Sequence, residues 1–127
     1  MLPKILLLLV EDDLTIRSML EEALEEAGYA VTAAQNGSEA IKLLDQQRGE
    51  LKGLITDIDL GEGPEGWDVA RHARELCAEM PVVYMSGASA HHWTSHGVPK
   101  SVLVAKPFAP AQIITAISTL LNNVPPA

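Results

Sequence analysis

The chain has few of the features that would tie it to nucleic acid, to a membrane or to an oxidising compartment. Cys77 is the only cysteine, so no intrachain disulfide can form and the redox compartment stays open. Lysine and arginine together number 9, against 17 aspartates and glutamates, which gives a net charge of −8. Nonspecific binding to nucleic acid or to anionic membranes needs basic patches, so the composition disfavours both.

Long hydrophobic segments are also missing. The run Ile5–Val10 resembles the core of a signal peptide, but Glu11-Asp12-Asp13 ends it at once and no small-residue cleavage site follows. The run is also far shorter than the ~20 residues that a membrane helix needs. We therefore interpret it as a buried strand and expect a cytoplasmic protein without membrane contact.

The chain does contain alternating strand and helix patterns. Its 127 residues, 47% of them hydrophobic, predict one globular domain over 1–127, in which 122–127 form a C-terminal tail. Repeats, low-complexity tracts and an internal linker are lacking. The predicted strands are Lys4–Val10, Tyr29–Ala33, Gly53–Asp57, Pro81–Met85 and Ser101–Ala105.

Helical spacing of apolar residues fills most of the segments between these strands. The apolar positions that carry the pattern are Ile16, Met19, Leu20, Ala23, Leu24 and Ala27, then Ile41 and Leu44, then Val69, Ala73, Leu76 and Cys77, and finally Ile113, Ile117, Leu120 and Leu121. Trp67–Glu79 is predicted to be helical, with Cys77 in the core. Residues 90–100 show no apolar stripe and predict at most a short or irregular helix. The alternation is typical of an α/β fold with a parallel sheet and helices on both faces.

Polar residues follow four of the predicted strands. Glu11-Asp12-Asp13 comes after the first strand, Asp57 after the third, Ser86 after the fourth and Lys106 after the fifth. In open α/β sheets the ligand crevice lies beyond the carboxyl ends of the strands, so neighbouring strands would bring these groups together. Clustered carboxylates repel one another unless a cation neutralises them, and oxygen ligands of this kind suit Mg²⁺.

Residues of these types, brought together, could carry out phosphoryl transfer. A carboxylate beside a metal ion and a lysine can attack phosphorus and form an aspartyl phosphate. Each residue also has a simpler interpretation when taken alone. Asp57 fits a loop cap, the acidic run fits a helix N-terminus, Ser86 fits a turn and Lys106 fits a solvated strand end.

Four segments taken together resemble the receiver domain of two-component response regulators, of the chemotaxis-regulator-like single-domain type. The segments are Leu8-Leu9-Val10-Glu11-Asp12-Asp13, Leu54-Ile55-Thr56-Asp57-Ile58-Asp59-Leu60, Val83-Tyr84-Met85-Ser86-Gly87 and Val104-Ala105-Lys106-Pro107-Phe108. The resemblance covers essentially the whole chain. It implies a flavodoxin-like, doubly wound five-stranded sheet in the order 2-1-3-4-5, an order that the strand pattern alone does not select.

The resemblance also implies a role for each polar residue. Asp57 would accept a phosphoryl group from a phosphohistidine of a sensor histidine kinase or histidine phosphotransfer protein. Lys106 would bind the phosphate, Ser86 would be the switch hydroxyl, and Asp13 would point away. The ligands of Mg²⁺ would be Glu11, Asp12, Asp57 and the backbone carbonyl of Asp59. The Lys106–Pro107 bond is often cis in this family.

As a receiver, the protein would assist only its own phosphorylation and dephosphorylation and would not be a turnover enzyme. Its output would come through protein contacts, with an unidentified downstream target, a possible homodimer and no direct nucleic-acid binding. Three features depart from the family. Leu103 stands where an aromatic residue is usual, Gly61–Asp68 replaces a Pro-x-Met-Asp-Gly-like loop, and the fourth helix is weak. We therefore expect the phosphorylation pocket to be intact and the surface that contacts signalling partners to be altered.

Other functions remain open at this point. An aspartyl-nucleophile phosphohydrolase would use Asp59 as general acid, although the chain shows no cap domain. A flavin mononucleotide binder is disfavoured because the first strand–helix loop is acidic. A receiver could also act as an interaction module without phosphorylation. A transition-metal site is disfavoured, because its candidate ligands, His91, His92 and His96, lack helical context. Trp67 and Trp93 could anchor a partner or cover the core edge.

Overall fold

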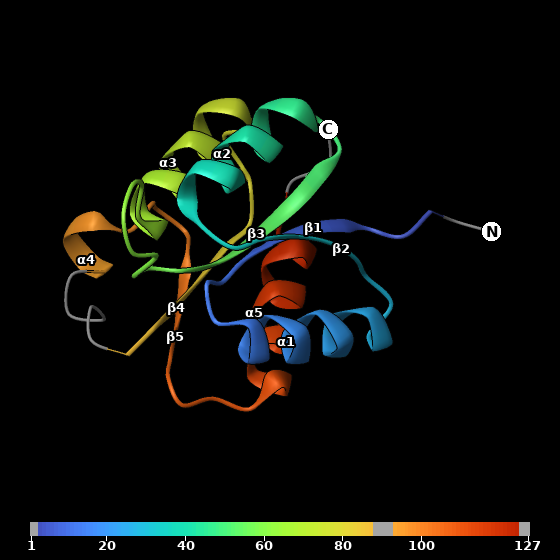
Figure 1. Cartoon of the computed structure of the whole chain (residues 1–127). Coiled ribbons are helices and arrows are strands. Elements are labelled where there is room, and N and C mark those ends of the chain that lie inside the picture. Colours follow the sequence, from blue (N-terminus) through green and yellow to red (C-terminus); the bar gives the residue numbers. More distant parts are fainter. Residues whose placement is uncertain (1–2, 88–92, 125–127) are drawn as a thin grey trace.

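The computed structural model describes residues 3–87 and 93–124, and strands and helices alternate through them (Figure 1). The strands are β1 (Leu6–Val10), β2 (Ala30–Ala34), β3 (Leu51–Asp57), β4 (Val82–Ser86) and β5 (Val102–Ala105). The helices are α1 (Leu14–Glu26), α2 (Gly37–Gln46), α3 (Gly66–Leu76), α4 (Trp93–His96) and α5 (Pro110–Asn122). None of these helices is long and apolar enough to cross a membrane.

All five strands pair in parallel, in the order β2-β1-β3-β4-β5. The order implied by the family resemblance is therefore confirmed. β1 lies between β2 and β3, which explains why it is apolar on both faces. The parallel arrangement places the carboxyl ends of β1, β3, β4 and β5 along one edge of the sheet.

The core has two layers, one on each face of the sheet. Leu7 and Leu9 of β1 join a cluster with buried residues of α1 and α5, while Leu8 and Val10 join a cluster with buried residues of α2 and α3. This division follows from the period of two along a strand. Figure 1 shows α1 and α5 on one side of the sheet and α2, α3 and α4 on the other.

The prediction for Cys77 is wrong. α3 ends at Leu76, the Cys77 backbone is extended, and its side chain is exposed. The N–H of Met80 donates to the carbonyl of Cys77 in the turn that follows, and Met80 takes the buried position instead. The apolar stripe continued in the sequence, but the helix did not.

Other boundaries differ by a few residues. β3 begins at Leu51, two residues before the predicted start, and a register irregularity lies between Leu6 and Leu7 where β1 pairs with β3. Met19 lies on the outer side of α1 and is 40% exposed. The weak helical pattern after the fourth strand corresponds to the single turn of α4. His91 and His92 lie outside the described residues.

Candidate phosphoacceptor site

The site begins at the end of β1. Glu11 is fully buried, and its backbone N–H donates to the carbonyl of Ala34 at the end of β2, so the acidic run starts while the chain is still held in the sheet. Asp12 is exposed. Asp13 caps α1, because its Oδ1 accepts from the N–H of Ile16 at 3.0 Å. The acidic run therefore gives two carboxylates to the sheet edge and one to the helix.

Asp57 ends β3 beside this edge and is 5% exposed. The hydroxyl of Thr56 donates to the Asp57 carbonyl at 2.8 Å, and the N–H of Ile58 donates to the carbonyl of Met85 on β4. One carboxylate oxygen from each of Glu11, Asp12 and Asp57 lies within 4.8 Å of the others. The three acids predicted to share a cation do lie together.

Lys106 joins this cluster from the end of β5. Its Nζ donates to Glu11 Oε1 at 3.0 Å and to Asp57 Oδ2 at 3.1 Å, and its side chain is 25% exposed. Its backbone N–H donates to the carbonyl of Ser86 at 2.8 Å, which holds the ends of β4 and β5 together. Ser86 is fully buried at this edge. The Lys106–Pro107 bond is cis, as the family resemblance implies.

The electrostatics of the cluster favour added positive charge. Burial of Glu11, reinforced by the neighbouring Asp12 and Asp57, raises its pKa to about 7, and Lys106 only partly opposes that rise. Burial alone would lower the pKa of Lys106, but the hydrogen bonds and negative charges of Glu11 and Asp57 outweigh burial and raise it. When ionised, the three carboxylates exceed the single ammonium by two negative charges.

Two residues that support the site were not assigned a role from the sequence. Arg17 Nη1 donates to the Glu11 carbonyl at 2.8 Å and ties α1 to the site. A side chain at Gly66 would clash with the backbone of Asp57, so glycine is needed where α3 begins against the end of β3. The glycines around Pro64 were the only sequence signal of this close approach.

The predicted contribution of Asp59 stays a prediction. Asp59 lies two residues beyond Asp57, with its side chain exposed. The other predicted members, Glu11, Asp12, Asp57, Ser86 and Lys106, all lie at the carboxyl edge of the sheet.

Residues 7–118 match the model of the response regulator receiver domain, and the chain therefore belongs to that family of two-component signalling proteins. It is 33% identical to the response regulator receiver protein CpdR of Brucella abortus (strain 2308), over 91% of this chain and 95% of that protein. These two findings define a signalling module rather than a class of metabolic enzyme.

Solved structures support the same conclusion. A response regulator receiver protein from Sinorhizobium medicae WSM419 is 42% identical, with a TM-score of 0.94 and coverage of 98% of this chain and 100% of that one. The receiver domain of the sensor histidine kinase PA1611 from Pseudomonas aeruginosa PAO1 shares the fold at 21% identity, with a TM-score of 0.80, covering 95% of this chain and all of that one. That structure has a magnesium ion coordinated in its active-site cleft.

Proposed function

We propose that Asp57 accepts a phosphoryl group and that its phosphorylation changes a protein-interaction surface. The observation that carries the proposal is the contact of Lys106 Nζ with both Asp57 and Glu11, beside a third carboxylate from Asp12. A nucleophilic carboxylate, a fixed cation and additional acidic ligands are what phosphoryl transfer to an aspartate needs.

The phosphodonor that fits the family is a phosphohistidine on a sensor histidine kinase or histidine phosphotransfer protein. In the transfer, an Asp57 oxygen forms a bond to phosphorus as the phosphorus–nitrogen bond breaks, and the imidazole leaves with that electron pair. Lys106 neutralises charge on the transferred group from a position it already holds beside Asp57. The product is an aspartyl phosphate.

Mg²⁺ fits the donor set of this site. The carboxylates of Glu11, Asp12 and Asp57 are hard oxygen ligands, and their excess negative charge suits a divalent cation. We infer that they would hold the ion together with the backbone carbonyl of Asp59. When bound, Mg²⁺ neutralises phosphoryl oxygens during transfer.

Exposed apolar residues beside the site support docking of a protein donor. Leu14 at the start of α1 is 65% exposed, and Met19 on the same helix is 40% exposed. Ile16, Met19 and Phe108 line a hollow with Lys106 and Pro107 that has a volume of about 390 Å³. A donor seated over these residues would place its histidine near Asp57.

The alternatives are less well supported. Family membership does not favour a phosphohydrolase. The cytoplasmic location and the homodimer remain predictions.

The experiment that tests Asp57 as phosphoacceptor is incubation with acetyl phosphate and Mg²⁺, followed by intact mass measurement. We expect one added phosphoryl group on the wild type and none on Asp57→Asn. Asp13→Asn is the matched control and should be labelled, because Asp13 caps α1.

Equal labelling of the wild type and Asp57→Asn would overturn the assignment. Absence of label from every variant, with normal folding, would favour an interaction module that works without phosphorylation. Sustained turnover of p-nitrophenyl phosphate would favour the phosphohydrolase.

A further inference from the structure

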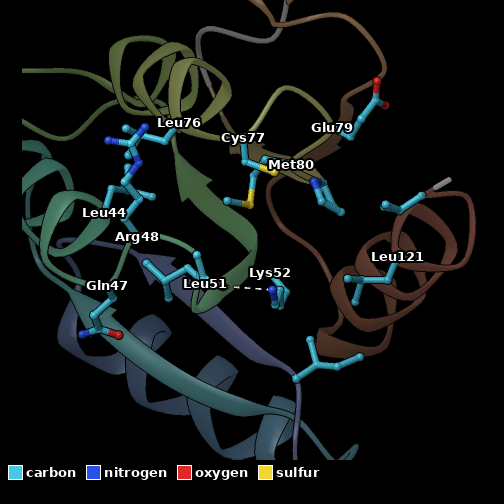
Figure 2. A pocket seen from close by; sticks show the side chains of 14 residues that line it. Leu44, Gln47, Arg48, Leu51, Lys52, Leu76, Cys77, Glu79, Met80 and Leu121 are labelled. Carbon is cyan, nitrogen blue, oxygen red and sulfur yellow. Dashed lines mark hydrogen bonds between the residues drawn. The ribbon is translucent and has the colours of Figure 1, made fainter. Parts of the chain in front are cut away.

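A second concave site lies at the amino ends of the strands, at the opposite end of the sheet from Asp57. It has a volume of about 680 Å³ and is lined by the end of α2, the start of β3, the end of α3 and the end of α5 (Figure 2). β3 runs from this pocket at Leu51 to the phosphoacceptor site at Asp57, a distance of roughly 20 Å along the strand. The two sites are therefore separate.

The pocket has an apolar interior. Leu44, Leu51 and Met80 line it and are each at least 95% buried, while Leu76 and Leu121 line it from α3 and α5. Its volume lies within the range of about 300–1,000 Å³ that is usual for small-molecule sites, which are mostly apolar with a few polar groups. The concave shape fits a compact apolar body.

Exposed hydrophobic residues mark the rim. Ile5, before β1, is 41% exposed, and Val124, after α5, is 39% exposed. They are two of the four large hydrophobic side chains that are exposed in the part of the chain that the structure describes. Apolar surface that remains open to water around an apolar pocket is typical of a binding site.

The polar groups at the pocket are mainly cationic, although the protein has a net charge of −8. Arg48 and Lys52 both line the pocket. Lys52 Nζ makes one hydrogen bond, to the carbonyl of Gly49 at 2.9 Å, and retains two further donors. Arg48 is exposed, and Figure 2 shows its guanidinium directed away from Lys52. Glu79 also lines the pocket, but Figure 2 shows its carboxylate directed away from Lys52.

We propose that this pocket binds a small amphipathic organic anion, with its apolar body between Leu44, Leu51 and Met80 and its anionic group at Lys52. Lys52 is exposed, so its ammonium can exchange water for an anionic group while the apolar body covers the buried surface. The proposal is independent of the phosphoryl transfer proposed for Asp57, since it involves none of the same residues.

The test uses decanoate as the probe, with decanol and decyltrimethylammonium as neutral and cationic counterparts, all below the concentrations at which they aggregate. Cys77 is the only cysteine, is exposed and lines the pocket, so its alkylation by neutral iodoacetamide reports occupancy. We expect decanoate to slow alkylation saturably. Decanol should bind about tenfold more weakly, and decyltrimethylammonium should give no protection.

Matched variants test the role of the cations. Lys52→Gln should weaken decanoate binding by about tenfold and leave decanol binding unchanged, as expected for loss of a hydrogen bond to a charged group, whereas Arg48→Gln should have a smaller effect on decanoate. Lys42→Gln, an exposed lysine on α2 away from the pocket, should change neither. Labelling of Asp57 by acetyl phosphate should be normal in all three variants, because the two sites are separate.

Equal protection by decanoate and decanol would overturn the proposal, as would an effect of Lys42→Gln equal to that of Lys52→Gln. Slowed alkylation that tracks protein concentration without any probe, with a dimer in sedimentation, would assign the pocket to a second copy of the chain and also overturn it.

Discussion

Lys106 connects the acidic ends of two strands through one ammonium group. Its contacts with Glu11 and Asp57 hold both carboxylates in place before any phosphoryl group arrives. A preorganised cation of this kind acts without reorganisation during the reaction. The residue type was predictable from the sequence, but its simultaneous contact with both acids depends on the three strand ends meeting.

Replacement of Lys106 by glutamine tests that role. We expect Lys106→Gln to lower the rate of labelling by acetyl phosphate about 100-fold, because a charge-stabilising donor is lost next to Asp57. The rate is measured by intact mass at successive times, with circular dichroism to verify folding. Lys42→Gln is the control. A rate within a factor of two of the wild type would show that Lys106 is dispensable.

Tyr84 has a hydroxyl that is held inside the protein by one hydrogen bond. It is fully buried on β4, its oxygen accepts from the N–H of Val98 at 3.1 Å, and its ring lies 4.8 Å from that of Trp67. Tyr84→Phe should lower the free energy of unfolding in urea by about 1–3 kcal/mol, because the Val98 N–H loses its partner. No loss would mean that Val98 finds another acceptor.

The same residue predicts a pH dependence. Burial raises the pKa of Tyr84. Its contribution to stability is therefore fully present below its unfolded pKa of about 10 and is lost as the pH rises through the folded value. Urea unfolding from pH 8 upward should show a steeper decline for the wild type than for Tyr84→Phe. Parallel declines would contradict this assignment.

At the scale of elements, the strands were the most predictable part of the chain. Strands buried on both faces produce continuous apolar runs, and those runs were visible in the sequence. The end of α3 could not be predicted from the sequence, because its position depends on tertiary contacts. Arg74 donates to the carbonyls of Met80 and Pro99, and these bonds fix the turn that leaves Cys77 outside the core. Long-range bonds of this kind have no local signature.

Leu103, which stands where the family resemblance implies an aromatic residue, lies on the β4–β5 pair. Leu103 on β5 pairs in register with Tyr84 on β4, and the aromatic ring on this pair is therefore carried by the neighbouring strand. Trp67 and Trp93 also pack in this layer, Trp67 as a buried residue and Trp93 partly buried. These placements favour the interpretation that both tryptophans cover the core.

Beryllofluoride, which mimics the phosphoryl group, tests how the protein responds to phosphorylation with leucine at position 103. We expect backbone amide shifts in nuclear magnetic resonance to be larger at Ser86 and Lys106 than at Leu103, because leucine lacks the ring whose rotation would report the change. The Asp57→Asn variant with beryllofluoride is the control and should show no comparable shifts. Shifts at Leu103 as large as those at Ser86 would refute the prediction.

For the molecule as a whole, we expect cation binding at the acidic edge to raise stability. Removing repulsion among Glu11, Asp12 and Asp57 favours the folded state. Mg²⁺ at 100 times its dissociation constant should raise the free energy of unfolding by about 2.7 kcal/mol. Asp12→Asn should reduce this gain, whereas Asp13→Asn should retain it. Equal gains for Mg²⁺ and for matched ionic strength from NaCl would indicate screening instead of a site.

The position of the phosphoryl group on the chain tests the central claim most directly. After labelling with acetyl phosphate and Mg²⁺, reduction with borohydride converts an aspartyl phosphate to homoserine, which peptide mass spectrometry locates. The account predicts homoserine at position 57, formed only when acetyl phosphate is present. Label at Asp12, Asp13 or Asp59, with position 57 unchanged, would contradict it.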